Sequence, residues 1–314
     1  MAIRRPDGYV GKPAEAGTDV FTMDVGNGSS TIPSHDSGFP VDFAFVKQFA
    51  GTTDWDTSAR LMSEKFVKTN TTAAQDTSTG YTFDSSVGWG SASWLDSAVQ
   101  SWMWKRGAGM DVLVWEGNQV AGRKLSHSLN SVPEMMWAKM RTGGTSSWAV
   151  YHKGLNNATN PQNWSLALNS NSAQNGVETW QYTAPTSTHV TLGAVSAVNV
   201  NGRKYVMMLF SSVTGISKVS SYTGTGSSGL SVTTGFQPRF LIIKRADAGS
   251  TNWLVFDSVR GFSSGNDSQL ALNTDSAAVT NTNFGEFTST GFTINETYTE
   301  INNNGGNYLY YAHA

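Results

Sequence analysis

The chain has 314 residues, a formal net charge of −2 and no cysteine, and only 14% of its residues are charged. Phosphate binding needs clustered Lys and Arg, and none of the 21 basic residues lies in a run longer than two, which argues against a nucleic-acid partner. The lack of cysteine excludes disulfides and thiolate metal sites, and no stretch approaches the roughly 18 apolar residues of a membrane-spanning helix, so we expect no membrane insertion.

Residues 1–17 differ from the rest of the chain. They contain Pro6, Pro13 and several glycines, without an apolar period and without the apolar region of a secretory signal. We expect an extended arm that is disordered in the isolated protein and becomes ordered against a neighbouring subunit in an assembly.

A short apolar run, a polar turn and a tryptophan follow one another in Gly38–Met62, and the same order recurs in Ser131–Leu155 and Gly235–Phe262. Short runs of β-branched and aromatic residues bounded by turn residues predict strands, and we interpret each stretch as a β-hairpin. A proline just before the first strand is tolerated because that position need not donate to the ladder. The tryptophan opens the return strand, where its ring can cover the core and its N–H can reach a loop carbonyl.

The spacing from proline to tryptophan is fifteen residues in all three stretches, and a lysine follows each first apolar run. We therefore predict that these prolines and tryptophans form the structural core of a repeat. The prolines and tryptophans are Pro40 and Trp55, Pro133 and Trp148, and Pro238 and Trp253, and the lysines are Lys47, Lys139 and Lys244.

Each unit closes on an aromatic and methionine-rich strand, Ser101–Arg106, Tyr205–Ser212 or Tyr308–Ala314. Before it, "LALN" opens Leu166–Gln174 and Leu270–Ala278, with a weaker echo in Val67–Gln75. We predict three tandem units at 18–106, 107–212 and 213–314, the first being the most diverged. The predicted fold class is all-β, with an antiparallel, jelly-roll-like β-sandwich in each unit.

No motif nominates a catalytic centre. "GFSSG" at Gly261–Gly265 matches the spacing of a nucleophile elbow, but that motif needs a helix after it and a strand-like run follows. None of the five histidines lies in a zinc-binding pair, and the spacing of the carboxylates nominates no glycosidase pair. We predict no catalytic residue, no metal site and no cofactor, and therefore no enzyme.

Four tryptophans do not recur and lie in loops rich in Ser, Asn and Gly: Trp89, Trp94, Trp164 and Trp180. Exposed aromatic rings in such loops can stack on sugars or anchor a protein interface. We take Trp164 and Trp180 as candidate surface-binding residues. Packing beneath a long loop is the interpretation that we favour over surface binding.

The segments "AGRKLSHSLNSVP", "SSWAVYHKGL", "LALN" and "APTST", all between Gly117 and Thr188, resemble a module of marine and cyanobacterial tailed-phage structural proteins. The third unit resembles the second half of that module, and the resemblance covers 107–314 well and the first unit poorly. The resemblance implies a non-enzymatic virion protein, and it carries no catalytic motif to transfer.

Three functions remain open from the sequence. The first is a bacteriophage virion protein assembled in the host cytoplasm, either a tail-fibre or receptor-binding protein or a capsid decoration or knob protein. Its partners would be other capsid or tail subunits and a host-surface glycan or receptor, and we expect a homo-oligomer or a lattice array. The second is a lectin-like module that binds host glycan, and the third is a depolymerase with a carboxylate pair in one groove.

Overall fold

The computed structural model describes residues 14–314, which are built almost entirely from antiparallel strands. The predicted all-β class is confirmed. Within this range the helices are four short 3-10 turns, the first being η1 (Gly17–Asp19), and none of them has the length and apolar character that crossing a bilayer would need. Most of the predicted N-terminal arm, residues 1–13, lies outside the described residues.

Three large sheets form the body of the protein, one from each of the ranges 18–106, 107–212 and 213–314, which we call the first, second and third segments. The first sheet has the order β1 (Phe21–Val25), β8 (Val99–Trp104), β3 (Phe43–Gln48), β4 (Asp56–Ala59), β5 (Lys65–Lys68) and β6 (Asp76–Thr77). The second has the order β9 (Met110–Glu116), β16 (Lys204–Phe210), β11 (Met135–Met140) and β12 (Ala149–His152). The third has the order β17 (Ser217–Thr223), β25 (Asn307–His313), β19 (Phe240–Arg245), β20 (Leu254–Asp257), β21 (Asp267–Ala271) and β22 (Val279–Thr282).

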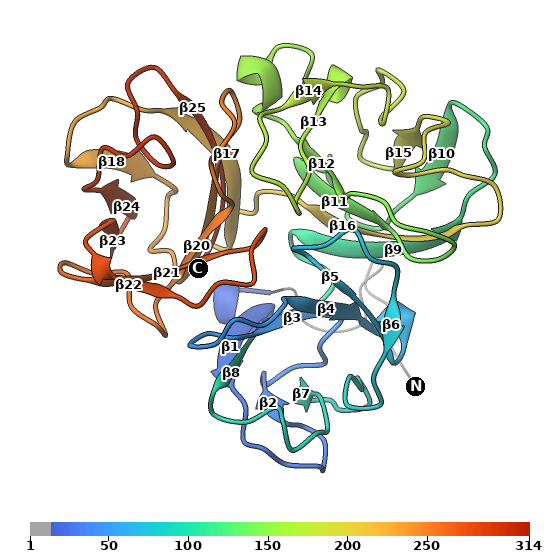
Figure 1. Ribbon diagram of the computed structural model, residues 1–314, viewed down its shortest axis with the longest axis horizontal. Coiled ribbons are helices and arrows are strands. Elements are labelled where there is room, and N and C mark those ends of the chain that lie inside the picture. The colour runs from blue at the N-terminus through green and yellow to red at the C-terminus, as the bar shows by residue number, and fades with distance from the viewer. Residues whose placement is uncertain (1–13) are drawn as a thin grey trace.

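A smaller sheet covers the outer side of each large one, so each segment has two layers (Figure 1). The smaller sheets are β2 (His35–Asp36) with β7 (Gly88–Trp89), β10 (Arg123–Ser126) with β15 (His189–Leu192), and β18 (Leu230–Thr233) with β24 (Gly291–Ile294) and β23 (Gly285–Thr288). A short pair, β13 (Trp164–Ser165) and β14 (Asn175–Gly176), lies in the second segment, where the remaining turns are η3 (Leu155–Ala158) and η4 (Pro161–Asn163); η2 (Arg60–Met62) follows β4.

The three predicted hairpins are present as the antiparallel pairs β3–β4, β11–β12 and β19–β20. The predicted closing strands are β8, β16 and β25, and each pairs with the first strand of its hairpin. Each closing strand therefore lies inside its sheet, with partners on both sides.

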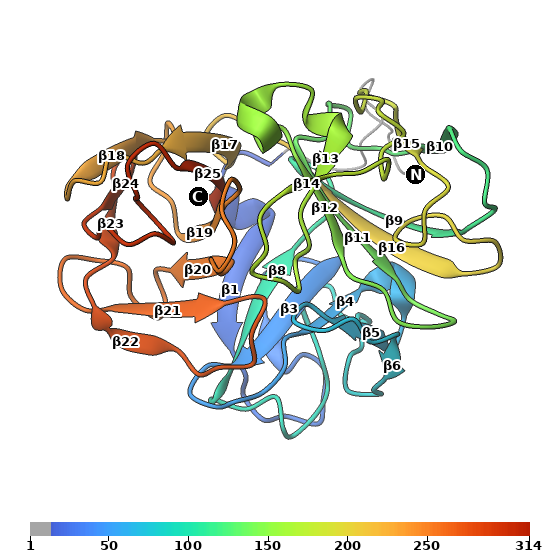
Figure 2. The ribbon, with the colours of Figure 1, turned by 45° about the horizontal axis from the view of Figure 1, so that its top comes forward.

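The large sheets are buried on both faces. In β11, Met135 and Trp137 belong to one hydrophobic cluster, and Met136, Ala138 and Met140 belong to another. The first cluster contains residues of all three segments, and we call it the shared core. The second lies under the smaller sheet of the second segment, and the other segments have equivalent local cores. Figures 1 and 2 show the three sheets grouped around the middle of the molecule.

Aromatic side chains from all three segments meet in the shared core. The Phe210 ring of the second segment lies 6.3 Å from the Trp104 ring of the first and 5.0 Å from the Tyr311 ring of the third. Trp104 Nε1 donates to the Tyr311 hydroxyl at 3.2 Å. The three segments therefore do not form sandwiches in series with separate interiors. Apolar side chains alternate to both faces of each large sheet, so both faces must be covered.

The recurring tryptophans join neighbouring segments. Trp55, Trp148 and Trp253 are 0%, 1% and 2% exposed, as predicted for core residues. Each indole N–H donates to a backbone carbonyl of another segment, so the three contacts form a closed cycle. The bonds run from Trp55 to Ala271 at 2.9 Å, from Trp148 to Lys68 at 2.8 Å and from Trp253 to Ala167 at 3.0 Å.

The recurring lysines are buried beside these tryptophans. Lys139 Nζ donates to the Ser146 carbonyl of its own hairpin at 2.9 Å and to the Thr72 carbonyl of the first segment at 3.1 Å. Lys47 Nζ likewise donates to a carbonyl of the third segment, that of Asp275, at 2.8 Å. Lys244 donates within its own segment, to the Arg245 carbonyl and to Thr251 Oγ1, both at 2.7 Å. Burial lowers the pKa of each of these three lysines to about 8, so all remain mainly protonated at neutral pH.

The assignment of Pro40 to the repeat core is wrong. Pro133 and Pro238 are buried, whereas Pro40 is exposed and Val41 takes the equivalent position at 0% exposure. Val41, Pro133 and Pro238 are thus equivalent. In each segment the next residue, such as Asp42 after Val41, donates its backbone N–H to a carbonyl of the closing strand. The lysine and tryptophan are eight residues apart in the first segment and nine in the others, so a shorter hairpin loop offsets one extra residue before the strand.

Three histidines are buried: His35, His152 and His313. His152 Nε2 lies 3.3 Å from the Tyr310 carbonyl of the third segment, and its Nδ1 accepts the Gly154 N–H at 3.0 Å. A second ring proton, on Nδ1, would point at the Gly154 N–H, and this disfavours the charged form of His152. Burial lowers the pKa to about 4 for His35 and His152 and to about 3 for His313.

Replacing Trp148 with Phe should lower the free energy of unfolding by about 2 kcal/mol. The change removes the donor to the Lys68 carbonyl and leaves a smaller ring in a buried site. Urea unfolding followed by circular dichroism measures the effect, with Trp94→Phe as the control because Trp94 is 46% exposed. A loss no larger than in the control would contradict the role given to the cross-segment bond.

Stability should also fall on acidification through the buried histidines. Their folded pKa values lie below the unfolded value of about 6.5, so the unfolded state binds more protons between pH 6.5 and 4, and stability is lost as pH falls through that window. Asp56, whose folded pKa is raised to about 6, acts in the opposite sense.

The His152→Gln variant isolates the contribution of one histidine. Its unfolding free energy, measured at several pH values between 4 and 6.5, should fall less steeply than that of the wild type by up to about 1.4 kcal/mol per pH unit. Parallel curves for the two proteins would show that His152 is not held neutral.

Candidate functional site

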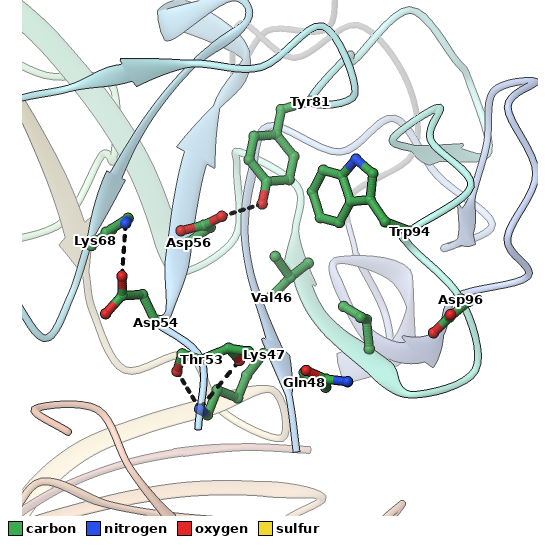
Figure 3. A pocket seen from close by; sticks show the side chains of 11 residues that line it. Val46, Lys47, Gln48, Thr53, Asp54, Asp56, Lys68, Tyr81, Trp94 and Asp96 are labelled. Carbon is green, nitrogen blue, oxygen red and sulfur yellow. Dashed lines mark hydrogen bonds and ion pairs between the residues drawn. The ribbon is translucent and has the colours of Figure 1, made fainter. Parts of the chain in front are cut away.

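A cavity of about 450 Å³ lies in the first segment, beside the ends of β3 and β4 (Figure 3). Its lining includes Val46 of β3 and Val99 of β8, both nearly buried, from neighbouring strands of the large sheet. The long connection between β6 and β8 supplies Tyr81, Trp94 and the residues near them. The sheet therefore provides a fixed base, and this connection provides one side of the cavity.

Trp94 is the exposed aromatic residue of this cavity. Its ring is 5.2 Å from that of the buried Tyr81, at an interplanar angle of 84°, so the two rings meet edge to face. A Cβ atom at Gly80 would lie 2.8 Å from Ala92 Cβ and 3.3 Å from Trp94 Cζ2. The glycine thus allows the chain to pass close to the indole, and this packing positions the ring.

Two carboxylates from the β3–β4 hairpin stand opposite Trp94 in Figure 3. The Tyr81 hydroxyl donates a hydrogen bond to Asp56 Oδ2 at 2.5 Å, and burial raises the Asp56 pKa to about 6 although this bond acts to lower it. Asp54 accepts from Lys68 Nζ and from Asn70 Nδ2, both at 2.7 Å. Burial alone would raise the Asp54 pKa, but these hydrogen bonds hold it below its ordinary value.

Gln48 and Asp96 also line the cavity, and both are exposed. One Asp96 oxygen accepts the Ala98 N–H at 2.9 Å. Both lysines of the lining are engaged. Lys68 binds Asp54, and the Lys47 ammonium group donates to the backbone carbonyls of Gly51 and Asp275. The exposed polar groups of the lining are therefore the Asp96 carboxylate and the Gln48 carboxamide, and the Lys68–Asp54 ion pair is partly exposed.

The candidate surface residues of the sequence analysis lie elsewhere. Trp180 is 1% exposed and packs against Tyr151 in the local core of the second segment, so it is not a surface residue. Trp164 is half-buried against the shared core, and Trp89 is fully buried with its indole N–H bonded to Ser101. Packing beneath loops is thus the correct interpretation for Trp180 and Trp89, and exposure singles out Trp94.

A second cavity, of about 540 Å³, lies between the first and third segments. Its rim includes the exposed apolar residues Val25 and Val259. The buried Asp257 carboxylate nearby is paired with Arg260 at 2.7 Å and also accepts the Trp102 indole N–H at 3.1 Å. This charged pair is satisfied within the protein.

The segment that matches the spacing of a nucleophile elbow is followed by a strand and not by a helix. Gly261–Gly265 leads into strand β21, and the Ser263 N–H donates to Asp267 at 3.0 Å. Within residues 14–314, no group of three or more His, Asp or Glu side chains is placed to hold a metal ion.

Comparison with known proteins identifies the family. The domain of unknown function DUF7483 matches residues 91–314, more than two thirds of the chain, beginning within the β7–β8 connection and including Trp94. No curated protein and no solved structure matches the chain. The chain therefore belongs to the DUF7483 family.

Proposed function

We propose that the protein is a non-enzymatic structural protein on the surface of a tailed-phage particle, either a tail-fibre or receptor-binding protein or a capsid decoration protein. Its partners are neighbouring capsid or tail subunits, and its place is in the virion. The resemblance of Gly117–Leu155 to phage structural modules suggests this class of protein.

The observation that carries the proposal is the place of the resembling residues in the fold. Trp148, Tyr151 and His152 of the "WAVYH" segment are all buried. Trp148 and His152 also make hydrogen-bonding contacts with the first and third segments. The resemblance therefore falls on residues that hold the three segments together, as expected for a protein whose task is to provide a rigid body.

The contacts of the pocket carboxylates support a non-enzymatic role. A glycosidase needs one carboxyl group free to donate a proton and a second free to act as base or nucleophile. Asp56 is bound to the Tyr81 hydroxyl, and Asp54 is paired with Lys68 and Asn70. These contacts favour a binding surface over a hydrolytic one.

A lectin-like, glycan-binding module is the second candidate. The exposed Trp94 beside polar groups favours it, because an aromatic face next to hydrogen-bonding side chains can hold a polar ligand with hydrophobic C–H faces. This candidate is compatible with a place on a virion, since a particle-surface protein can also recognise a host glycan.

The location of the protein can be tested directly on particles. Antibodies raised against the purified chain should label intact virions at a repeated position in electron micrographs, because structural proteins occupy equivalent sites. Mass spectrometry of gradient-purified particles should show the chain at a constant ratio to the major capsid protein. Detection in the soluble lysate alone would contradict the proposal.

The non-enzymatic assignment has a separate test. Incubation of the purified protein with host-surface polysaccharide should release no new reducing ends. Release that disappears in an Asp56→Asn variant would instead establish a depolymerase.

A further inference from the structure

We propose that the cavity around Trp94 binds a neutral sugar residue of a polysaccharide, which stacks on the indole ring and hydrogen-bonds to Gln48 and Asp96. The inference deepens the glycan-binding candidate function and rests on it; it does not require that the protein be part of a virion.

Trp94 provides the stacking surface. Large aromatic side chains usually bury most of their area, yet this one is 46% exposed at the edge of a cavity. Its edge-to-face contact with Tyr81 and its close approach to Gly80 hold the ring in place without covering it completely. A rigid, partly exposed indole presents an apolar face on which the C–H groups of a pyranose ring can lie.

The residues around the ring match the hydroxyl groups of a sugar. The exposed Gln48 carboxamide can both donate and accept, and the Asp96 carboxylate has accepting capacity beyond its bond to Ala98. Hydroxyl groups of a sugar ring stacked on Trp94 can therefore find hydrogen-bonding partners within the same cavity. The volume of about 450 Å³ falls in the range of small-ligand pockets, roughly 300–1,000 Å³.

The charges of the cavity favour a neutral sugar over an acidic one. Asp54 is neutralised by Lys68, and the Lys47 ammonium group is directed at backbone carbonyls. The lining therefore carries three carboxylates, Asp54, Asp56 and Asp96, against two ammonium groups, and the attraction of Lys68 to Asp56 is shared with Asp54. The carboxylate of a uronic or sialic acid would be repelled by this excess of negative charge, because both lysines of the lining are already engaged.

Only the first segment offers this arrangement among the loop tryptophans. In the second segment Trp180 lies before β15 and is buried, and the connection that follows β15, which corresponds to the one with Trp94 after β7, carries no aromatic residue. The exposed Tyr298 of the third segment lies in the connection after β24, where its ring meets Phe284. We therefore expect one sugar site per chain.

The experiment uses the full chain and defined oligosaccharides. Cellotetraose, mannotetraose, maltotetraose and chitotetraose serve as neutral probes and tetragalacturonic acid as the acidic probe, with binding measured by isothermal titration calorimetry and saturation-transfer NMR. At least one neutral probe should bind, with saturation transfer to the sugar C–H protons, and the acidic probe should bind more weakly.

Variants locate the site. Trp94→Ala should weaken binding of the neutral probe about tenfold, and Gln48→Ala and Asp96→Asn should each weaken it several-fold. Tyr182→Ala is the matched control, because Tyr182 is a 55% exposed aromatic residue of the second segment, and its affinity should equal that of the wild type. Thermal unfolding of every variant verifies that it is folded, and Gln48→Ala tests the same cavity if Trp94→Ala proves unstable.

The outcomes separate the site from the function. Binding that is retained in both Trp94→Ala and Gln48→Ala would overturn this site while leaving glycan binding in place. Failure of the wild type to bind any neutral probe would overturn the glycan-binding function itself, and preference for the acidic probe would overturn the assignment of a neutral sugar. None of these results depends on whether the protein is found on particles.

Discussion

The architecture depends on three sheets that are apolar on both faces. One face of each sheet lies against the shared core and the other against a local core under a smaller sheet. A β-sandwich with a single interior could leave its outer faces in water, but these sheets cannot. Because separation of the segments would expose rings such as Phe210 and Trp104, the hydrophobic effect that folds each segment also holds the segments together.

Bringing sheets together in this way buries backbone carbonyls at the contacts between segments, and these carbonyls need donors. Long side chains supply many of them. The indoles of Trp55, Trp148 and Trp253 each reach a neighbouring carbonyl, and Lys47 and Lys139 do the same with their ammonium groups. The burial of a lysine is stabilised here by several carbonyl acceptors rather than by a carboxylate. Burial at these contacts lowers the pKa of both lysines.

Sequence reasoning reached the hairpins and the closing strands because turn residues and short apolar runs are local signals. It also predicted that the tryptophan N–H can reach a loop carbonyl. It did not predict which segment supplies the carbonyl, because that depends on the arrangement of the sheets. Nearly continuous apolar runs, such as "MMWAKM" with the single charged residue Lys139, are typical of strands buried on both faces, and that signal was present in the sequence. The pocket was harder to find. Trp94 and Trp180 lie in similar polar loops, and only tertiary packing decides that one is exposed and the other buried.

The closed cycle of three indole contacts also opposes the gain or loss of a segment. Each segment donates its indole N–H to one neighbour and offers a backbone carbonyl to the indole of the other. An open-ended solenoid can gain or lose a repeat at its tips because each repeat touches only the next. In this ring, duplication or deletion of one segment would leave an indole donor and a backbone acceptor unpaired and would disrupt the shared core.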